Sequence, residues 1–100
     1  MTIKIGNYNF EGPYANASDV RSASGVYVIL GRSGVEPYRV LDVGESANMQ
    51  DRLRNHDRQN QWAKCGYAHV HAAVLYVNGY TRMDIERTLR SLYNPTCGIR

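Results

Sequence analysis

The sequence predicts an α/β fold, in the form of an α+β sandwich with a small, mainly antiparallel sheet of three central strands flanked by helices. Three observations lead to this prediction. Two short apolar runs with strand periodicity are joined by turn residues, helix-capping residues follow them, and a third apolar run precedes a final amphipathic segment. One hundred residues, 43% of them hydrophobic, are enough for one domain with a modest core.

The first two strands form a predicted hairpin. Apolar residues alternate along 26–30 and again along 38–45, and Ser33-Gly34 between them is typical of a turn. With a turn centred near Gly34, Tyr27 falls opposite Asp42 or close to it, on the same face. Because facing Cβ atoms of an antiparallel pair lie about 5 Å apart, we expect the phenol and the carboxylate to be neighbours.

A helix follows this hairpin. Asn48 is a favourable N-cap, and Asp51 three residues later resembles a capping box. Arg52 and His56 are four residues apart, so they are expected to form one stripe of the helix. A helix packed on the hairpin can aim both side chains at the face that carries Tyr27.

The rest of the chain continues with a helix, a strand and a helix. A short helix is predicted over 58–65 and a third strand over 67–77. Thr81 is the expected cap of the last helix. That helix is expected to end near Asn94, because the following Pro95 disfavours helical geometry in the residue before it.

The N-terminal segment gives a weaker signal. Residues 1–10 alternate weakly around Gly6-Asn7 and can add a strand or a small hairpin, whereas 12–24 has loop composition with room for a short helix from Ser18. We therefore interpret residues 1–100 as a single domain, with a core over about 25–98 and an N-terminal extension over 1–24.

Composition and charge restrict the class of protein. No apolar run approaches the roughly 20 residues of a membrane span, and the N-terminus lacks the apolar core of a signal peptide, so we expect a cytoplasmic protein without membrane contact. Cys65 and Cys97 make no disulfide framework, so both are expected as reduced thiols.

Ten of the twelve basic residues are arginine, which binds phosphate in a bidentate way. Three of them gather on or near the first helix and are candidate nucleic-acid contacts, unless they form a solvated face: Arg52, Arg54 and Arg58.

An ordered set of residues resembles the GIY-YIG nuclease domain, over roughly residues 25–98. The matching positions, in order, are Gly25-Val26-Tyr27, Asp42-Val43-Gly44, Asn48, Arg52, His56, Glu86 and Asn94. This family cuts phosphodiester bonds in DNA with one divalent metal ion. The resemblance implies that Glu86 binds the metal, Mg²⁺ or Mn²⁺, that Arg52 contacts the phosphate, and that Asn94 supports the site.

The resemblance also assigns Tyr27 and His56 to water activation, and it has one departure. Asp42-Val43-Gly44 stands where the family has Tyr-Ile-Gly. A carboxylate cannot copy a phenol, but Asp42 can accept a proton, hold a second water or join Glu86 on the metal. It can also mark a site that has lost activity.

The expected function is therefore that of a metal-dependent DNA endonuclease or nickase. One active site cuts one strand per engagement, so a double-strand break needs a dimer or a second encounter. Without a separate DNA-reading domain, specificity would come from a branched or damaged substrate or from a partner protein.

Other interpretations remain open at this point. The chain can be an inactive nucleic-acid-binding module of the same fold, or a protein-interaction domain. Glu86 can simply pair with Arg90, four residues later on the same helix. A zinc site from His69, His71 and the two cysteines has little support, because structural zinc ligands usually come in closely spaced pairs on turns.

Overall fold

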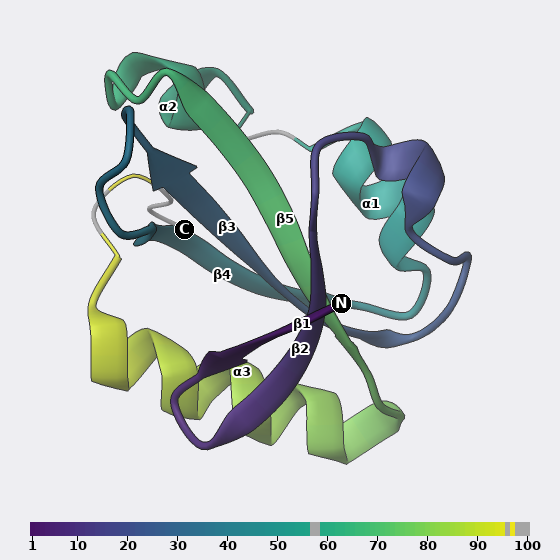
Figure 1. Cartoon of the computed structure of the whole chain (residues 1–100). Helices are drawn as coiled ribbons and strands as arrows, with labels where there is room; N and C mark the ends of the chain where they lie inside the picture. The colour runs from purple at the N-terminus through teal and green to yellow at the C-terminus, as the bar shows by residue number, and fades with distance from the viewer. Residues whose placement is uncertain (57–58, 96, 98–100) are drawn as a thin grey trace.

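One open antiparallel sheet organises the molecule (Figure 1). The computed structural model describes residues 1–56, 59–95 and 97, and within them the sheet has five strands. In chain order these are β1 (Thr2–Ile5), β2 (Tyr8–Tyr14), β3 (Gly25–Arg32), β4 (Arg39–Ser46) and β5 (His69–Tyr76). Their spatial order is β1-β2-β5-β3-β4, so β3 lies between β5 and β4.

Helices lie on both faces of this sheet (Figure 1). The long helix α3 (Gly79–Tyr93) covers one face, while α1 (Met49–Arg54) and α2 (Gln59–Lys64) cover the other. A short 3₁₀ helix, η1 (Ala17–Asp19), precedes β3 and contacts α1. The prediction of an α+β fold with an antiparallel sheet and flanking helices is confirmed.

The alternation of side chains along β3 divides the hydrophobic core in two. Val26, Val28 and Leu30 face α3, and Tyr27 and Ile29 face α1 and α2. The α3 side also contains Ile5, Phe10, Val43, Ala73, Ile85 and Leu89, and the other side contains Val20, Leu41, Met49, Leu53, Trp62 and Val74. Burial of each large apolar side chain contributes about 1.5–3 kcal/mol.

The three predicted central strands are present, and the N-terminal hairpin that the sequence allowed joins the same sheet and raises the number of strands to five. Gly6 forms its turn with a φ of +60°, which glycine adopts at little cost. Strand β2 then pairs with β5, with Glu11 opposite Val74. Residues 1–24 therefore contribute to the core, to which they supply Ile5, Phe10 and Val20.

Helix ends follow the predicted signals only in part. The Asn48 side chain accepts a hydrogen bond from the backbone N–H of Asp51, as a capping residue should. The last helix begins earlier than predicted, with Asn78 rather than Thr81 at its N-cap position. Asn94 ends that helix in the left-handed conformation (φ 47°).

Cys65 and Cys97 form a disulfide, with Cα atoms 6.2 Å apart. The prediction of reduced thiols is therefore wrong for this structure. The two cysteines are 32 residues apart in sequence, and only the fold brings the end of α2 and the segment after α3 together. Among the described residues, no helix is long and apolar enough to span a membrane.

Candidate active site

A pocket of about 280 Å³ opens between the β3–β4 hairpin, α1 and α3. It brings together Tyr27 of β3, Arg52 of α1 and Glu86 of α3, which are far apart in the sequence. Two of these residues, Tyr27 and Glu86, are buried, so they form the inner wall. The complete lining among the described residues is Tyr27, Gly44, Glu45, Arg52, Met83, Glu86 and Arg87.

The phenol of Tyr27 packs directly on the backbone of Gly44. These two residues are register partners, and Asp42 is opposite Ile29 instead. Asp42 is therefore two residues away from the position opposite Tyr27, and the two side chains belong to the same face of the sheet, as predicted. A Cβ on Gly44 would lie 2.1 Å from the Tyr27 hydroxyl oxygen, so only glycine leaves room for the phenol.

His56 makes a hydrogen bond to the hydroxyl of Tyr27 through Nε2. The i, i+4 spacing predicted that His56 lies on the helix with Arg52. Helix α1 instead ends at Arg54, and His56 lies in the segment that follows it. It is nonetheless buried. The ring of Trp62 packs against the imidazole, with centroids 4.5 Å apart, which fixes His56 between the phenol and the indole.

Asp42 is fully buried, and both of its carboxylate oxygens accept hydrogen bonds from the protein. Its Oδ2 accepts a hydrogen bond from the indole N–H of Trp62 (2.9 Å), and its Oδ1 accepts one from Nη2 of Arg90 (2.6 Å). Its Oδ1 also accepts the backbone N–H of Val43 (2.8 Å). Asp42 is not one of the described residues that line the pocket. The suggestion that it joins Glu86 on a metal is therefore not supported by the position of its carboxylate.

Glu86 connects the pocket to this buried carboxylate. Its Oε2 lies 3.5 Å from Nε of Arg90, the i, i+4 ion pair that the sequence offered as the alternative for Glu86. Arg90 thus lies between two carboxylates, those of Asp42 and Glu86. The contacts form a chain whose two ends, Tyr27 and Glu86, both line the pocket. Between these ends the chain runs through His56, Trp62, Asp42 and Arg90.

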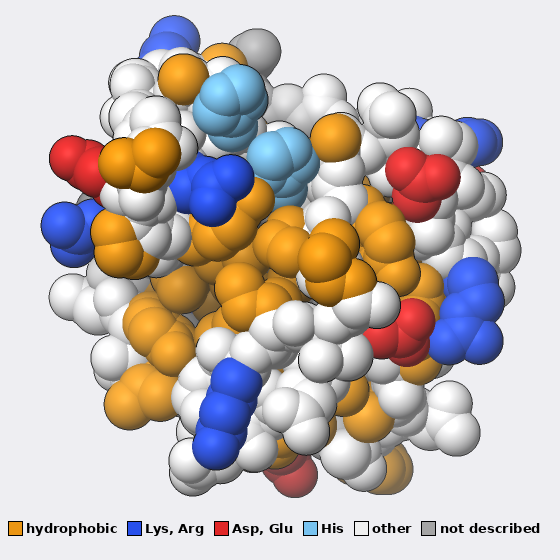
Figure 2. All heavy atoms as spheres, viewed as in Figure 1, with side chains coloured by type: hydrophobic (Ala, Val, Ile, Leu, Met, Phe, Trp, Pro, Cys, Tyr) orange, Lys and Arg blue, Asp and Glu red, His pale blue; other side chains and the backbone are white. Residues whose placement is uncertain are grey.

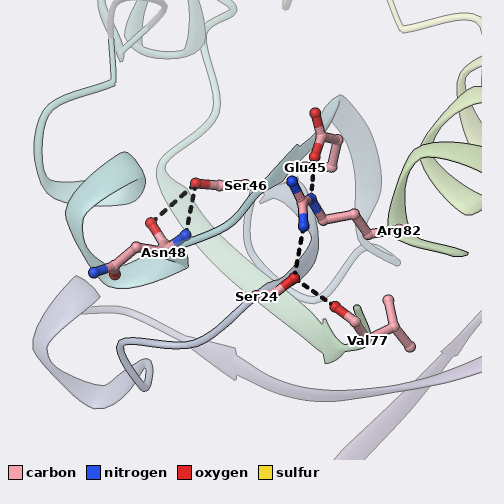
Figure 3. A network of polar contacts seen from close by, with 6 residues as sticks. All are labelled: Ser24, Glu45, Ser46, Asn48, Val77 and Arg82. Atoms are coloured by element: carbon pink, nitrogen blue, oxygen red, sulfur yellow. Dashed lines mark hydrogen bonds and ion pairs between the residues drawn. The ribbon is translucent and has the colours of Figure 1, made fainter. Parts of the chain in front are cut away.

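Glu45 adds a second carboxylate to the pocket wall. Figure 3 shows the polar contacts that hold its side chain. Glu45 forms an ion pair with Nε of Arg82, whose Nη1 donates to Oγ of Ser24 (3.0 Å). That hydroxyl in turn donates to the backbone carbonyl of Val77 (2.7 Å). This network joins β4, the start of β3 and the start of α3, so it fixes the rim of the pocket.

Three predicted site residues lie elsewhere or outside the described residues. Asn94 lies at the end of α3, where it lines a separate cavity of about 400 Å³ with Tyr38 and Tyr93. Arg54 is exposed and lines another cavity, of about 360 Å³. Arg58 lies outside the described residues.

Sequence reasoning did not assign Glu45, Trp62 or Arg90 to the site. Arg90 had a local signal, its i, i+4 spacing from Glu86, but that spacing says nothing about Asp42. Trp62 is the one tryptophan in the chain, and its contact with Asp42 depends on the placement of α2 over the sheet. A zinc site with both cysteines is excluded, because the two sulfurs are bonded to each other.

Comparison with other proteins does not assign this chain to a family. No protein-family model matches the chain, and searches of curated proteins and of solved structures give no significant match.

Proposed function

We propose that the protein is a metal-dependent nuclease of the GIY-YIG type, which hydrolyses phosphodiester bonds in DNA one strand at a time. The observation that carries the proposal is the convergence of Tyr27, Arg52 and Glu86 on one pocket from three separate elements. The order of elements from β3 to α3, in which a hairpin precedes two helices, a strand and a helix, agrees with the resemblance.

The polar residues in and behind the pocket have separate roles in this reaction. Arg52 contributes a fixed positive charge and two parallel donors for the oxygens of the scissile phosphate. The Tyr27 hydroxyl takes a proton from the attacking water as it gives its own proton to Nε2 of His56, with which it shares a hydrogen bond. Trp62 restricts rotation of His56, so the acceptor nitrogen stays directed at the phenol.

The donor set fits a hard divalent cation. Among the described residues, no three His, Cys, Asp or Glu side chains are grouped so that they could hold a metal ion. The pocket instead offers the carboxylates of Glu86 and Glu45. Mg²⁺ typically takes one or two carboxylates and retains several waters, so Glu86 would hold Mg²⁺ or Mn²⁺ with Glu45 close by. Such an ion, when bound, supplies charge stabilisation to the phosphoryl and leaving oxygens.

The test is a plasmid-nicking assay in Mg²⁺ or Mn²⁺. Glu86→Gln keeps the size of the side chain and removes its charge, and Arg52→Gln removes the guanidinium with its charge. Each is expected to lower the nicking rate by about 10²–10³-fold. Asp84→Asn is the matched control, because Asp84 is exposed on the same helix and is not among the pocket residues. It should retain the wild-type rate.

Two other outcomes would overturn the proposal. DNA binding that weakens with salt, without cleavage in either metal, would identify a nucleic-acid-binding module. No affinity for DNA or RNA would favour a protein-interaction domain. Thermal unfolding of each variant separates loss of chemistry from loss of fold.

A further inference from the structure

A cluster of cationic and aromatic side chains lies where the end of β3, the start of β5 and the residue before β4 meet. This imidazole patch consists of Arg32, Tyr38, His69 and His71. His69 and His71 lie with their rings parallel, with centroids 6.2 Å apart, and the Tyr38 hydroxyl is 3.3 Å from Nδ1 of His71. The guanidinium of Arg32 stacks on the Tyr38 ring, with 4.4 Å between its central carbon and the ring centroid. Figure 2 shows two histidines together on the surface, beside a cationic side chain and hydrophobic neighbours.

The patch lies away from the candidate active site. Tyr27 and Arg32 are five residues apart on β3, so their side chains project from opposite faces of the sheet. The same spacing separates them by about 16 Å along the strand. The described residues that line the active-site pocket include no member of the imidazole patch. A function of the patch is therefore separable from the proposed nuclease chemistry.

The positive charge of the patch is not neutralised by the described residues around it. Arg32 makes no ion pair with any of them, and its Nε is buried without a hydrogen-bond partner. Burial first, and then the nearby charges of His69 and Arg32, lower the pKa of His71. His69 and Arg32 therefore both oppose a positive charge on His71.

A second arginine in the chain shows what a neutralised arrangement looks like. Arg21 also stacks on a tyrosine, Tyr76, with 3.9 Å from its central carbon to the ring centroid. Unlike Arg32, it has an acidic partner, Glu11, at 3.5 Å. Both sites contain an arginine stacked on a tyrosine. Arg21 also has an ion pair with Glu11, and Arg32 has no such pair with a described residue.

We propose that the imidazole patch is a binding site for a phosphate group, either free or in a nucleic-acid backbone. The planar guanidinium of Arg32 presents donors that match two phosphate oxygens. Its stacking on Tyr38 restricts its orientation before the ligand arrives. The parallel imidazoles add N–H donors on the same face of the sheet, and a bound phosphate stabilises their protonated form.

The test follows the imidazole proton NMR signals of the histidines during titration with inorganic phosphate at constant ionic strength. The signals of His69 and His71 should shift in a saturable way, and the pKa of His71 should rise in phosphate. Arg32→Gln should weaken binding by about tenfold or more, because a charge-assisted hydrogen bond is lost. Arg21→Gln, the matched control, should change binding by less than about twofold.

A second variant keeps the test decisive if Arg32→Gln disturbs the fold. His69 is exposed at the rim, and His69→Gln should weaken binding without lowering thermal stability. A short single-stranded oligonucleotide that shifts the same signals more strongly than inorganic phosphate would assign the site to nucleic acid, whereas a response to inorganic phosphate alone would assign it to free phosphate. Equal effects of Arg32→Gln and Arg21→Gln, or equal shifts with acetate, would overturn the proposal.

Discussion

Replacement of Asp42 by Asn tests whether the buried carboxylate is structural. Asn keeps the size of the side chain but removes its charge, and it offers one acceptor oxygen where Asp42 offers two. In the structure the two carboxylate oxygens accept separate donors, from Trp62 and from Arg90. The amide nitrogen of Asn would therefore face one of these donors, and the charge of Arg90 would lose its closest partner.

The expected cost follows from the burial of this pair. Asp42 is 0% exposed and the Arg90 side chain 17%, and removal of one partner from a buried ion pair typically costs about 3–5 kcal/mol. Glu86, at 3.5 Å, still compensates part of the Arg90 charge, so we expect the lower end, about 3 kcal/mol. For a domain of this size that loss lowers Tm by roughly 12–24 °C.

Urea unfolding followed by circular dichroism measures this effect in the oxidised protein. Asp84→Asn is the control, because Asp84 pairs with Arg87 at 3.6 Å while both side chains are more than 70% exposed. Such a surface pair contributes below about 0.5 kcal/mol. If Asp42→Asn costs no more than Asp84→Asn, the carboxylate does not anchor Trp62 and Arg90.

Three further predictions concern packing, the disulfide and pH. Gly44→Ala should destabilise the fold by about 1–3 kcal/mol or more, because its Cβ would overlap the Tyr27 ring, and an unchanged urea midpoint would contradict this. Replacement of Cys65 and Cys97 by Ser should cost about 2–4 kcal/mol, measured as a lower Tm that reductant lowers no further, since the bond restricts the unfolded chain. The pKa of His71 is lowered from 6.5, chiefly by burial, so the unfolded chain binds a proton there at higher pH than the folded chain does. Stability should therefore fall as the pH drops below about 6.5, and His71→Gln should lose less than the wild type; identical pH profiles would refute this.

Local signals were sufficient for the elements from β3 to α3. The Asn48 cap could be predicted because its partner, Asp51, is three residues away. The register of the hairpin could not be predicted, because the loop between β3 and β4 extends past the predicted turn at Gly34. A shift in register between Ile29 and Leu30 adds to the difference. Such details depend on loop geometry, and a periodic pattern does not specify it.

Non-local contacts account for what the sequence did not reveal. The sequence indicated that residues 1–24 are an extension outside the core, because β5, the strand that pairs with β2, lies far along the chain. Asp42 looked like an altered catalytic residue, since its proximity to Trp62 and Arg90 exists only after α2 and α3 have packed. Residue identity placed Tyr27, Arg52 and Glu86 among the candidates, and the tertiary structure supplied the common pocket.

The strand order also determines when the sheet can assemble during synthesis. The ribosome releases β1 and β2 first, yet the neighbours of β2 are β1 and β5, and β5 emerges only after both short helices. An isolated two-stranded hairpin is marginally stable in water. The nascent chain therefore carries Ile5 and Phe10 without their sheet partner until β5 has emerged, and the rate at which the sheet closes depends on a search between distant segments.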